Sequence, residues 1–301
     1  MRTEILTGIA AAALAAAPAA AQQAADAVAP EAAAGGVFES AALAVQAALA
    51  AKAAGNPVEA ENWMIAAANP HAVEAGAAVL ARGGSAADAM VAVQAVLGLV
   101  EPQSSGLGGG AFLVWHDGAT GALTTLDGRE TAPLAATPRL FQDESGAPLK
   151  FFDAVVGGRS VGTPGTPALL EEAHRRWGRA PWPSLFDTAI DMADGGFSVS
   201  PRLAGLVERD AERLARFPAT AEYFLPDGAP LQAGATLKNP AYAETLRTLA
   251  AEGSAGFYGG PVAADILRTV QNARGNPGVL SAMDLSLYQV KERAPVCAAC
   301  R

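Results

Sequence analysis

Cysteine and histidine are scarce in this 301-residue chain, with two cysteines and three histidines in all. Cys297 and Cys300 form a Cys-x-x-Cys pattern at the end of the sequence. In a thioredoxin-like motif this pattern opens a helix, and here only Arg301 follows it. A zinc site would need two more ligands of this type. The two cysteines could form a local disulfide or remain as free thiols. The one Glu-x-x-His pattern, Glu171 to His174, lacks the second copy and the two extra glutamates of a di-iron site. We therefore expect no metal ion.

Basic residues and long apolar runs are also lacking. Lys and Arg number 21 against 30 Asp and Glu, a net charge of −9, which disfavours nucleic acid and anionic membranes as partners. The most apolar helix candidate, 86–99, is shorter than the roughly 20 residues that span a bilayer. Aromatic residues make up only 6% of a chain that is 51% hydrophobic, so its core should depend on close backbone packing.

The first residues have the pattern of a secretory signal. Arg2 precedes an apolar stretch at 5–17 and an Ala-x-Ala cleavage site at 19–21, which predicts a signal peptide at 1–21 and a periplasmic or secreted protein. A short Ala-rich helix is the alternative. Residues 22–60 are predicted as an Ala-rich leader or linker, and 61–301 as one domain of the α/β or α+β class.

Local patterns within 61–301 predict alternating helices and a hairpin. A capping box, Ser85 with Asp88, opens a buried helix over 86–99 that follows a helix at 72–82. Strands at 111–115 and 122–126 flank a turn and form a hairpin. A helix with Thr166 as N-cap ends near Gly178. Further helices are predicted at 184–194, 204–216, 240–252 and 261–273.

Several catalytic patterns are incomplete. The glycines at 106–110 follow a helix and precede a strand, which is the reverse of a Rossmann loop, and no Walker A ending is present, so close packing is the better explanation. A serine triad is not assigned, because the one Gly-x-Ser-x-Gly, at 158–162, lies in a predicted Gly-rich loop. Asp187 and Asp191 stand at helical spacing, which is typical of surface charge.

Arg129 is the candidate binding residue. It directly follows a predicted half-buried strand, where an unpaired guanidinium would be costly. It could pair with Glu130 or Asp127 for structural reasons, or it could hold a substrate carboxylate through two parallel hydrogen bonds.

From about residue 63 to 296 the chain resembles the large-subunit region of γ-glutamyltransferases, also called glutathione hydrolases. The matching stretches occur in family order and are Asn-Pro-His-Ala-Val-Glu-Ala-Gly (69–76), Gly-Gly-Ser-Ala-Ala-Asp-Ala (83–89), Gly-Leu-Gly-Gly-Gly-Ala-Phe (106–112), Leu-Asp-Gly-Arg-Glu-Thr-Ala-Pro (126–133), Thr-Pro-Gly-Thr (163–166), Phe-Tyr-Gly-Gly (257–260) and Asp-Leu-Ser-Leu-Tyr-Gln-Val-Lys-Glu-Arg-Ala-Pro-Val (284–296).

The resemblance implies the N-terminal-nucleophile hydrolase fold, a four-layer αββα sandwich, here incomplete because the small-subunit part is missing. It implies cleavage of γ-glutamyl amides such as glutathione and transfer of the γ-glutamyl group to water or an amine, by an N-terminal Thr whose own amine is the base. The resemblance also implies that no cofactor takes part. Arg129 resembles the large-subunit arginine that holds the α-carboxylate of the γ-glutamyl group.

The nucleophilic Thr has no counterpart, because no Thr-His dipeptide occurs and Thr124-Thr125 runs into Leu126. We therefore assign no catalytic residue, expect a small-subunit-like C-terminal polypeptide as partner, and expect the isolated chain to be inactive. Two alternatives remain: a non-catalytic remnant that binds γ-glutamyl ligands or nothing, and a related acylase of β-lactam side-chain amides.

Overall fold

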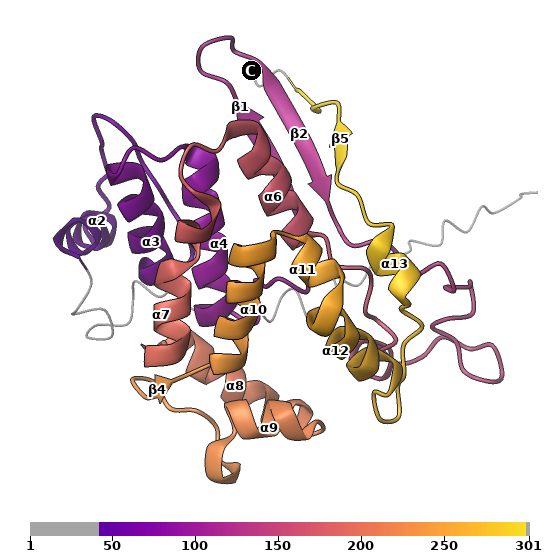
Figure 1. Cartoon of the computed structure of the whole chain (residues 1–301). Helices are drawn as coiled ribbons and strands as arrows, with labels where there is room; N and C mark the ends of the chain where they lie inside the picture. The colour runs from indigo at the N-terminus through magenta and orange to yellow at the C-terminus, as the bar shows by residue number, and fades with distance from the viewer. Residues whose placement is uncertain (1–41, 299–301) are drawn as a thin grey trace, which may run out of the picture.

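The computed structural model describes residues 42–298, so the expected signal peptide, residues 22–41 and Cys300 lie outside it. Helices predominate, and one three-stranded sheet lies along one side of them (Figure 1). The longer helices are α2 (Leu43–Ala53), α3 (Pro70–Ala81), α4 (Ala86–Val100), α6 (Thr166–Trp177), α7 (Asp187–Gly195), α8 (Pro201–Leu214), α10 (Pro240–Glu252) and α12 (Gly260–Gln271). The shorter ones are α5 (Phe151–Val155), η2 (Trp182–Leu185), α9 (Pro218–Phe224), η3 (Pro226–Gly228), α11 (Ala255–Tyr258) and α13 (Ala282–Ser286).

The main sheet is antiparallel and has the order β1-β2-β5. The predicted hairpin supplies β1 (Ala111–His116) and β2 (Leu123–Gly128), with Leu113 opposite Leu126. Its turn is closed by Asp117, whose carboxylate accepts the amides of Ala119 and Thr120 at 2.8 and 3.1 Å. The third strand, β5 (Lys291–Arg293), pairs with β2 from more than 160 residues away. A separate two-stranded sheet joins β3 (Phe197–Ser198) to β4 (Thr236–Leu237).

The two faces of the hairpin differ in burial. On the inner face Leu113 and Leu126 pack against Leu169 and Ala173 of α6. Trp115 of β1 and Trp177 of α6 extend this contact as stacked rings whose centroids are 4.5 Å apart. On the outer face Phe112 and Val114 are 63% and 68% exposed. Only one face of the sheet is therefore covered by the residues that the structure describes.

Helix α4 forms the centre of the core, as its apolar sequence predicts. It lies between α3 and α6 (Figure 1), and Val91, Ala95 and Leu99 are at most 1% exposed. Its capping box is confirmed: Ser85 Oγ accepts the Asp88 amide at 3.1 Å, and Asp88 Oδ2 accepts the Ser85 amide at 2.8 Å. The helix crosses the molecule as a core element, and no helix among residues 42–298 is long and apolar enough to cross a membrane.

Several predicted helix starts differ from the observed ones by one to three residues, and two of these differences have a clear cause. The N-cap of α6 is Gly165 and not Thr166, because the amides of both residues donate to the Gly109 carbonyl, at 2.8 and 3.1 Å. Helix α8 begins at Pro201, three residues earlier than predicted, because Ser200 Oγ accepts the Leu203 amide at 3.0 Å and caps the first turn. Part of the predicted 22–60 leader is helical, since it contains α2.

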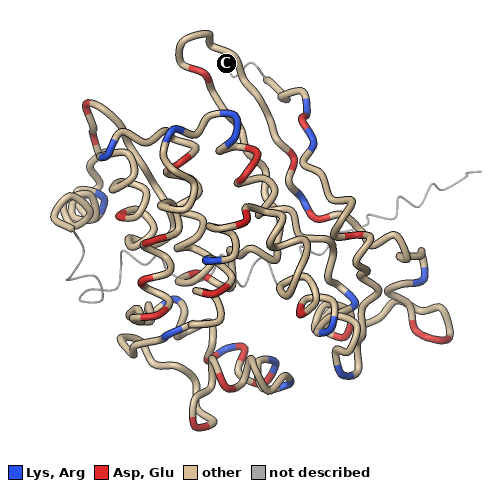
Figure 2. Tube along the Cα trace, viewed as in Figure 1, with Lys and Arg blue, Asp and Glu red and all other residues tan. Residues whose placement is uncertain are grey.

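Charged residues are spread over the described part of the chain. Figure 2 shows Lys and Arg interspersed with Asp and Glu over many elements, without a continuous basic stripe. The arginines at the end of α6 illustrate the pattern. Arg175 and Arg176 both contact Glu172 one turn earlier, and Arg176 also contacts Glu292 of β5 at 2.6 Å. Arg176 thus connects the helix to the sheet.

Candidate carboxylate-binding site

Arg129 follows the last residue of β2, as predicted. Its contacts show which of the two possible partners, Asp127 or Glu130, pairs with the guanidinium. Asp127 is occupied by others: its carboxylate accepts the Arg129 amide at 3.0 Å and the Arg293 guanidinium at 2.8 and 3.0 Å. These bonds hold the pKa of Asp127 below its ordinary value. The Arg129 guanidinium instead pairs with Glu130, with 3.1 Å between Nη2 and Oε2.

One ion pair leaves much of the Arg129 guanidinium available. The side chain is 54% exposed, and a guanidinium has five N–H donors. Glu130 Oε2 is buried and accepts no hydrogen bond within the described part of the chain, so its contact with Arg129 is purely ionic. The guanidinium can therefore bind a second carboxylate without losing a buried network.

Arg129 and Glu130 line a cavity of about 580 Å³. The loop between α4 and β1 also lines it, and Ser105 Oγ of this loop accepts a hydrogen bond from Gln94 Nε2 of α4 at 2.6 Å. None of the three histidines of the chain is among the lining residues, which are Gln94, Pro102, Ser104, Ser105, Gly106, Gly108, Gly109, Gly110, Ala111, Arg129, Glu130 and Thr166. The cavity thus offers anion binding and polar contacts, without a hydroxyl–imidazole pair for nucleophilic attack.

Glycines allow the backbone segments around Arg129 to approach one another. A Cβ on Gly110 would lie 2.7 Å from the Glu130 amide nitrogen and 2.8 Å from Arg129 Cα, so close packing is confirmed as the reason for this glycine. Gly106 and Gly108 have open space around them, and both line the cavity. Close packing therefore explains part of the Gly-rich loop and not all of it.

The segment 284–293 holds the Arg129 loop at three points, which the local sequence patterns did not predict. Asp284 accepts the Leu134 amide at 2.7 Å, the Tyr288 hydroxyl donates to the Arg129 carbonyl at 2.8 Å, and Arg293 binds Asp127. The only signal in the sequence was the family-like stretch at 284–296.

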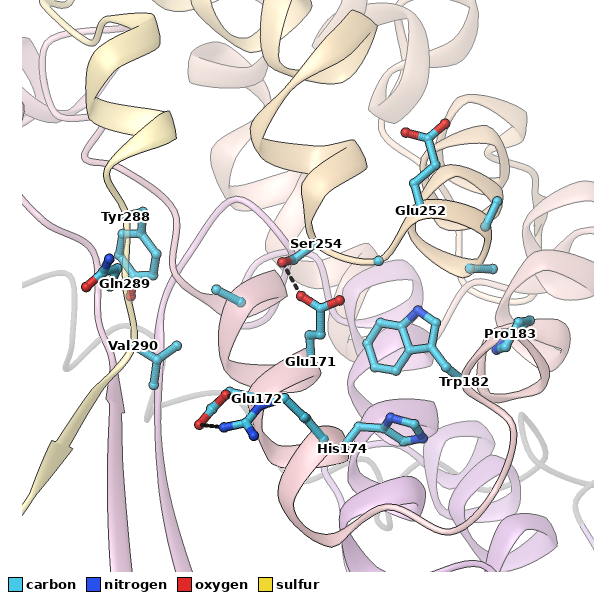
Figure 3. Close-up of a pocket in the computed structure, with 15 residues that line it drawn as sticks. Glu171, Glu172, His174, Trp182, Pro183, Glu252, Ser254, Tyr288, Gln289 and Val290 are labelled. Carbon is cyan, nitrogen blue, oxygen red and sulfur yellow. Dashed lines mark hydrogen bonds and ion pairs between the residues drawn. The ribbon is translucent and has the colours of Figure 1, made fainter.

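A second cavity, of about 770 Å³, lies between α6, the turn from α10 to α11, and residues 288–290 (Figure 3). Glu171 and His174, which stand at Glu-x-x-His spacing, have separate partners there. Glu171 accepts a hydrogen bond from Ser254, and His174 Nε2 lies 2.9 Å from the Ala180 carbonyl. Among residues 42–298 no group of three or more His, Cys, Asp or Glu is arranged to hold a metal ion. Cys297 is exposed.

Comparison with known proteins identifies the family of the chain. The family model described as "Gamma-glutamyltranspeptidase" matches residues 72–301. The glutathione hydrolase proenzyme of Bacillus subtilis (strain 168) is 40% identical over 236 residues, which are 78% of this chain and 40% of that protein. Acylase ACY 1 proenzyme of Pseudomonas sp. (strain V22) is 35% identical over 246 residues, 80% of this chain and 43% of that protein.

A solved structure agrees with the sequence matches. The crystal structure of Helicobacter pylori γ-glutamyltranspeptidase superposes with a TM-score of 0.77 at 32% identity, covering 81% of this chain and 69% of that one. The fold is therefore the α/β fold of the N-terminal-nucleophile hydrolases. The chain belongs to the γ-glutamyltranspeptidase family. It spans about 40% of the length of the B. subtilis proenzyme.

Proposed function

We propose that this chain supplies the α-carboxylate subsite of an enzyme that cleaves γ-glutamyl amides such as glutathione and transfers the γ-glutamyl group to water or to an amine. The observation that carries the proposal is Arg129: its guanidinium is half exposed, lines a cavity, and is engaged by a single carboxylate. Arginine suits this role because its planar fork binds a carboxylate through two parallel hydrogen bonds.

The proposed reaction divides the work between this chain and a second polypeptide. Arg129 would bind and orient the substrate, while the attack on the γ-carbonyl needs an activated nucleophile. The cavity around Arg129 contains Ser104, Ser105 and Thr166 but no histidine that could activate them. We therefore assign the nucleophilic Thr to a small-subunit-like polypeptide outside these 301 residues. Export to the periplasm belongs to the same proposal and is supported by the signal-like pattern at 1–21.

We expect Arg129→Ala to weaken glutamate binding at least tenfold, because charged hydrogen bonds to a carboxylate contribute about 1.5–3 kcal/mol. Isothermal titration of the folded chain with L-glutamate measures this loss. Arg268→Ala is the matched control: Arg268 is 69% exposed and paired with Asp265 on its own helix, like Arg129 with its neighbour, and it lines neither cavity. Equal affinities of the wild type and Arg129→Ala would overturn the assignment.

The outer face of the main sheet supports the proposal of a second polypeptide. Phe112 and Val114 of β1 and Leu123 of β2 are exposed there, and exposed apolar patches of this kind mark interfaces or lead to association. We expect the isolated chain to self-associate in analytical ultracentrifugation and Val114→Lys to reduce this association. A monodisperse wild-type monomer that unfolds cooperatively would contradict the proposed interface.

A β-lactam side-chain acylase is the second candidate, and the similarity to Acylase ACY 1 proenzyme favours it. The two candidates differ in the group that Arg129 would recognise. A γ-glutamyl substrate carries an α-amine beside the carboxylate, and a simple dicarboxylic acyl group does not. Titration with glutamate and with glutarate separates them: glutamate should bind more tightly for a γ-glutamyl enzyme, and equal or tighter glutarate binding would favour the acylase. No measurable binding of either would favour a non-catalytic remnant.

A further inference from the structure

Segment 284–293 makes three contacts around Arg129, one before it in the sequence, one at the residue itself and one after it. Arg293 holds the residue two positions before it, Asp127, and Asp284 holds the amide of Leu134 after it. Tyr288 contacts Arg129 itself, through a 2.8 Å hydrogen bond from its hydroxyl to the Arg129 carbonyl. Of the three, only Tyr288 binds the peptide from which the guanidinium side chain extends.

The Tyr288 ring is itself held in place. It stacks on the ring of Tyr258, with the ring centroids 5.6 Å apart and the planes 5° from parallel. A Cβ on Gly165 would overlap the Tyr288 hydroxyl oxygen, so the glycine leaves room for this hydrogen bond. Burial and the nearby carboxylates of Asp127 and Glu130 raise the pKa of Tyr288 to about 12, so the hydroxyl is a donor at neutral pH.

We propose that Tyr288 is a positioning residue for substrate binding: by fixing the Arg129 carbonyl it sets the direction in which the guanidinium enters the 580 Å³ cavity. The proposal rests on the proposed function, because it presumes that Arg129 binds the substrate carboxylate. The family-like stretch at 284–296, which lies more than 150 residues from Arg129 in the sequence, would then serve to hold Arg129 in place.

The test compares Tyr288→Phe with Tyr258→Phe in the full chain. Both variants keep the two stacked rings and lose one hydroxyl. Tyr288→Phe loses the hydrogen bond to the Arg129 carbonyl, whereas Tyr258→Phe loses only a 2.8 Å hydrogen bond to the Pro164 carbonyl. Loss of one such hydrogen bond should weaken L-glutamate binding about three- to tenfold in Tyr288→Phe, measured by calorimetry. Tyr258→Phe should bind within about twofold of the wild type, as expected where no contact to the Arg129 peptide is lost.

A spectroscopic readout separates positioning from general stability. In the chain labelled with ¹⁵N-arginine, the Nε–Hε signal of Arg129 is assigned by its disappearance in Arg129→Lys. We expect this signal to shift in Tyr288→Phe and to stay in place in Tyr258→Phe, with similar thermal unfolding midpoints for both variants. An unchanged signal and unchanged glutamate affinity in Tyr288→Phe would overturn the proposal.

Failure of the proposed function gives a different pattern. If Arg129→Ala binds glutamate as tightly as the wild type, the carboxylate site itself is wrong, and the role of Tyr288 in substrate binding is wrong with it. If Arg129→Ala loses affinity and Tyr288→Phe does not, the carboxylate site stands and only the positioning role is overturned.

Discussion

Replacing Asp88 with alanine should lower the free energy of unfolding by about 3–4 kcal/mol, the largest stability loss that we expect from a single polar residue. Asp88 is fully buried, and its Oδ2 accepts three amides: Ser85 at 2.8 Å, Arg179 at 2.9 Å and Ala180 at 3.0 Å. One carboxylate thus caps α4 and fixes the loop after α6. Alanine would leave all three amide donors without their acceptor.

Urea unfolding monitored by circular dichroism measures this loss. Asp88→Asn keeps an acceptor oxygen but removes the charge, and we expect it to cost about 1–2 kcal/mol. Asp191→Ala is the control, because Asp191 is an exposed carboxylate on α7 and its loss should stay within about 0.5 kcal/mol. A stability of Asp88→Ala equal to that of the control would contradict the assigned role.

The same residue predicts a pH dependence with a definite sign. Burial alone would raise the pKa of Asp88, but the hydrogen bonds from Ser85, Ala180 and Arg179 outweigh it and lower the pKa below its ordinary value. A lowered folded-state pKa stabilises the fold above the unfolded-state pKa of about 4 and ceases to do so as the pH falls through the folded value. The stability difference between the wild type and Asp88→Asn should therefore shrink below about pH 4.

Gly165→Ala should cost about 1–3 kcal/mol of stability and also impair the Arg129 site. The φ angle of Gly165 is −121°, which any residue adopts, so the substitution tests space and not backbone conformation. The added Cβ would overlap the Gly128 carbonyl and the Tyr288 hydroxyl. Because these atoms flank the Arg129 peptide, the methyl group must displace the strand end or the tyrosine.

Two measurements on Gly165→Ala check this expectation. Urea unfolding gives the loss of stability. Calorimetric titration should show that the affinity for L-glutamate falls roughly tenfold, as expected when one charged hydrogen bond to the ligand is lost. Gly106→Ala is the matched control, since Gly106 lines the same cavity and a Cβ there would meet nothing within 4 Å. If both variants bound and unfolded alike, the close approach at Gly165 would not matter for the site.

Local features of the fold were predictable from the sequence because their causes are local. Ser85 and Asp88 are three residues apart and satisfy each other's amides, so the start of α4 can be located without tertiary information. The hairpin at 111–128 combines alternating burial with a turn, and it places Arg129 at the end of a strand. The Ser200 cap of α8 was equally local, and it was missed.

What could not be predicted depends on contacts between distant segments. The start of α6 shifts to Gly165 because the Gly109 carbonyl, more than 50 residues away, accepts the first amides of the helix. The short strand β5 has a three-residue sequence with no periodicity of its own, and it forms because β2 offers an edge. For the same reason the contacts of Tyr288 with Arg129 and of Arg293 with Asp127 are seen only in the folded structure.

The proposed division of labour is tested most directly by asking whether the purified 301-residue chain releases the chromophore from a γ-glutamyl anilide. Because we assign substrate binding to Arg129 and the nucleophile to another polypeptide, we expect no release from a preparation that is folded by circular dichroism and binds glutamate. Release that survives repurification and disappears in Arg129→Ala would contradict this assignment, because a residue of this chain would then be the nucleophile.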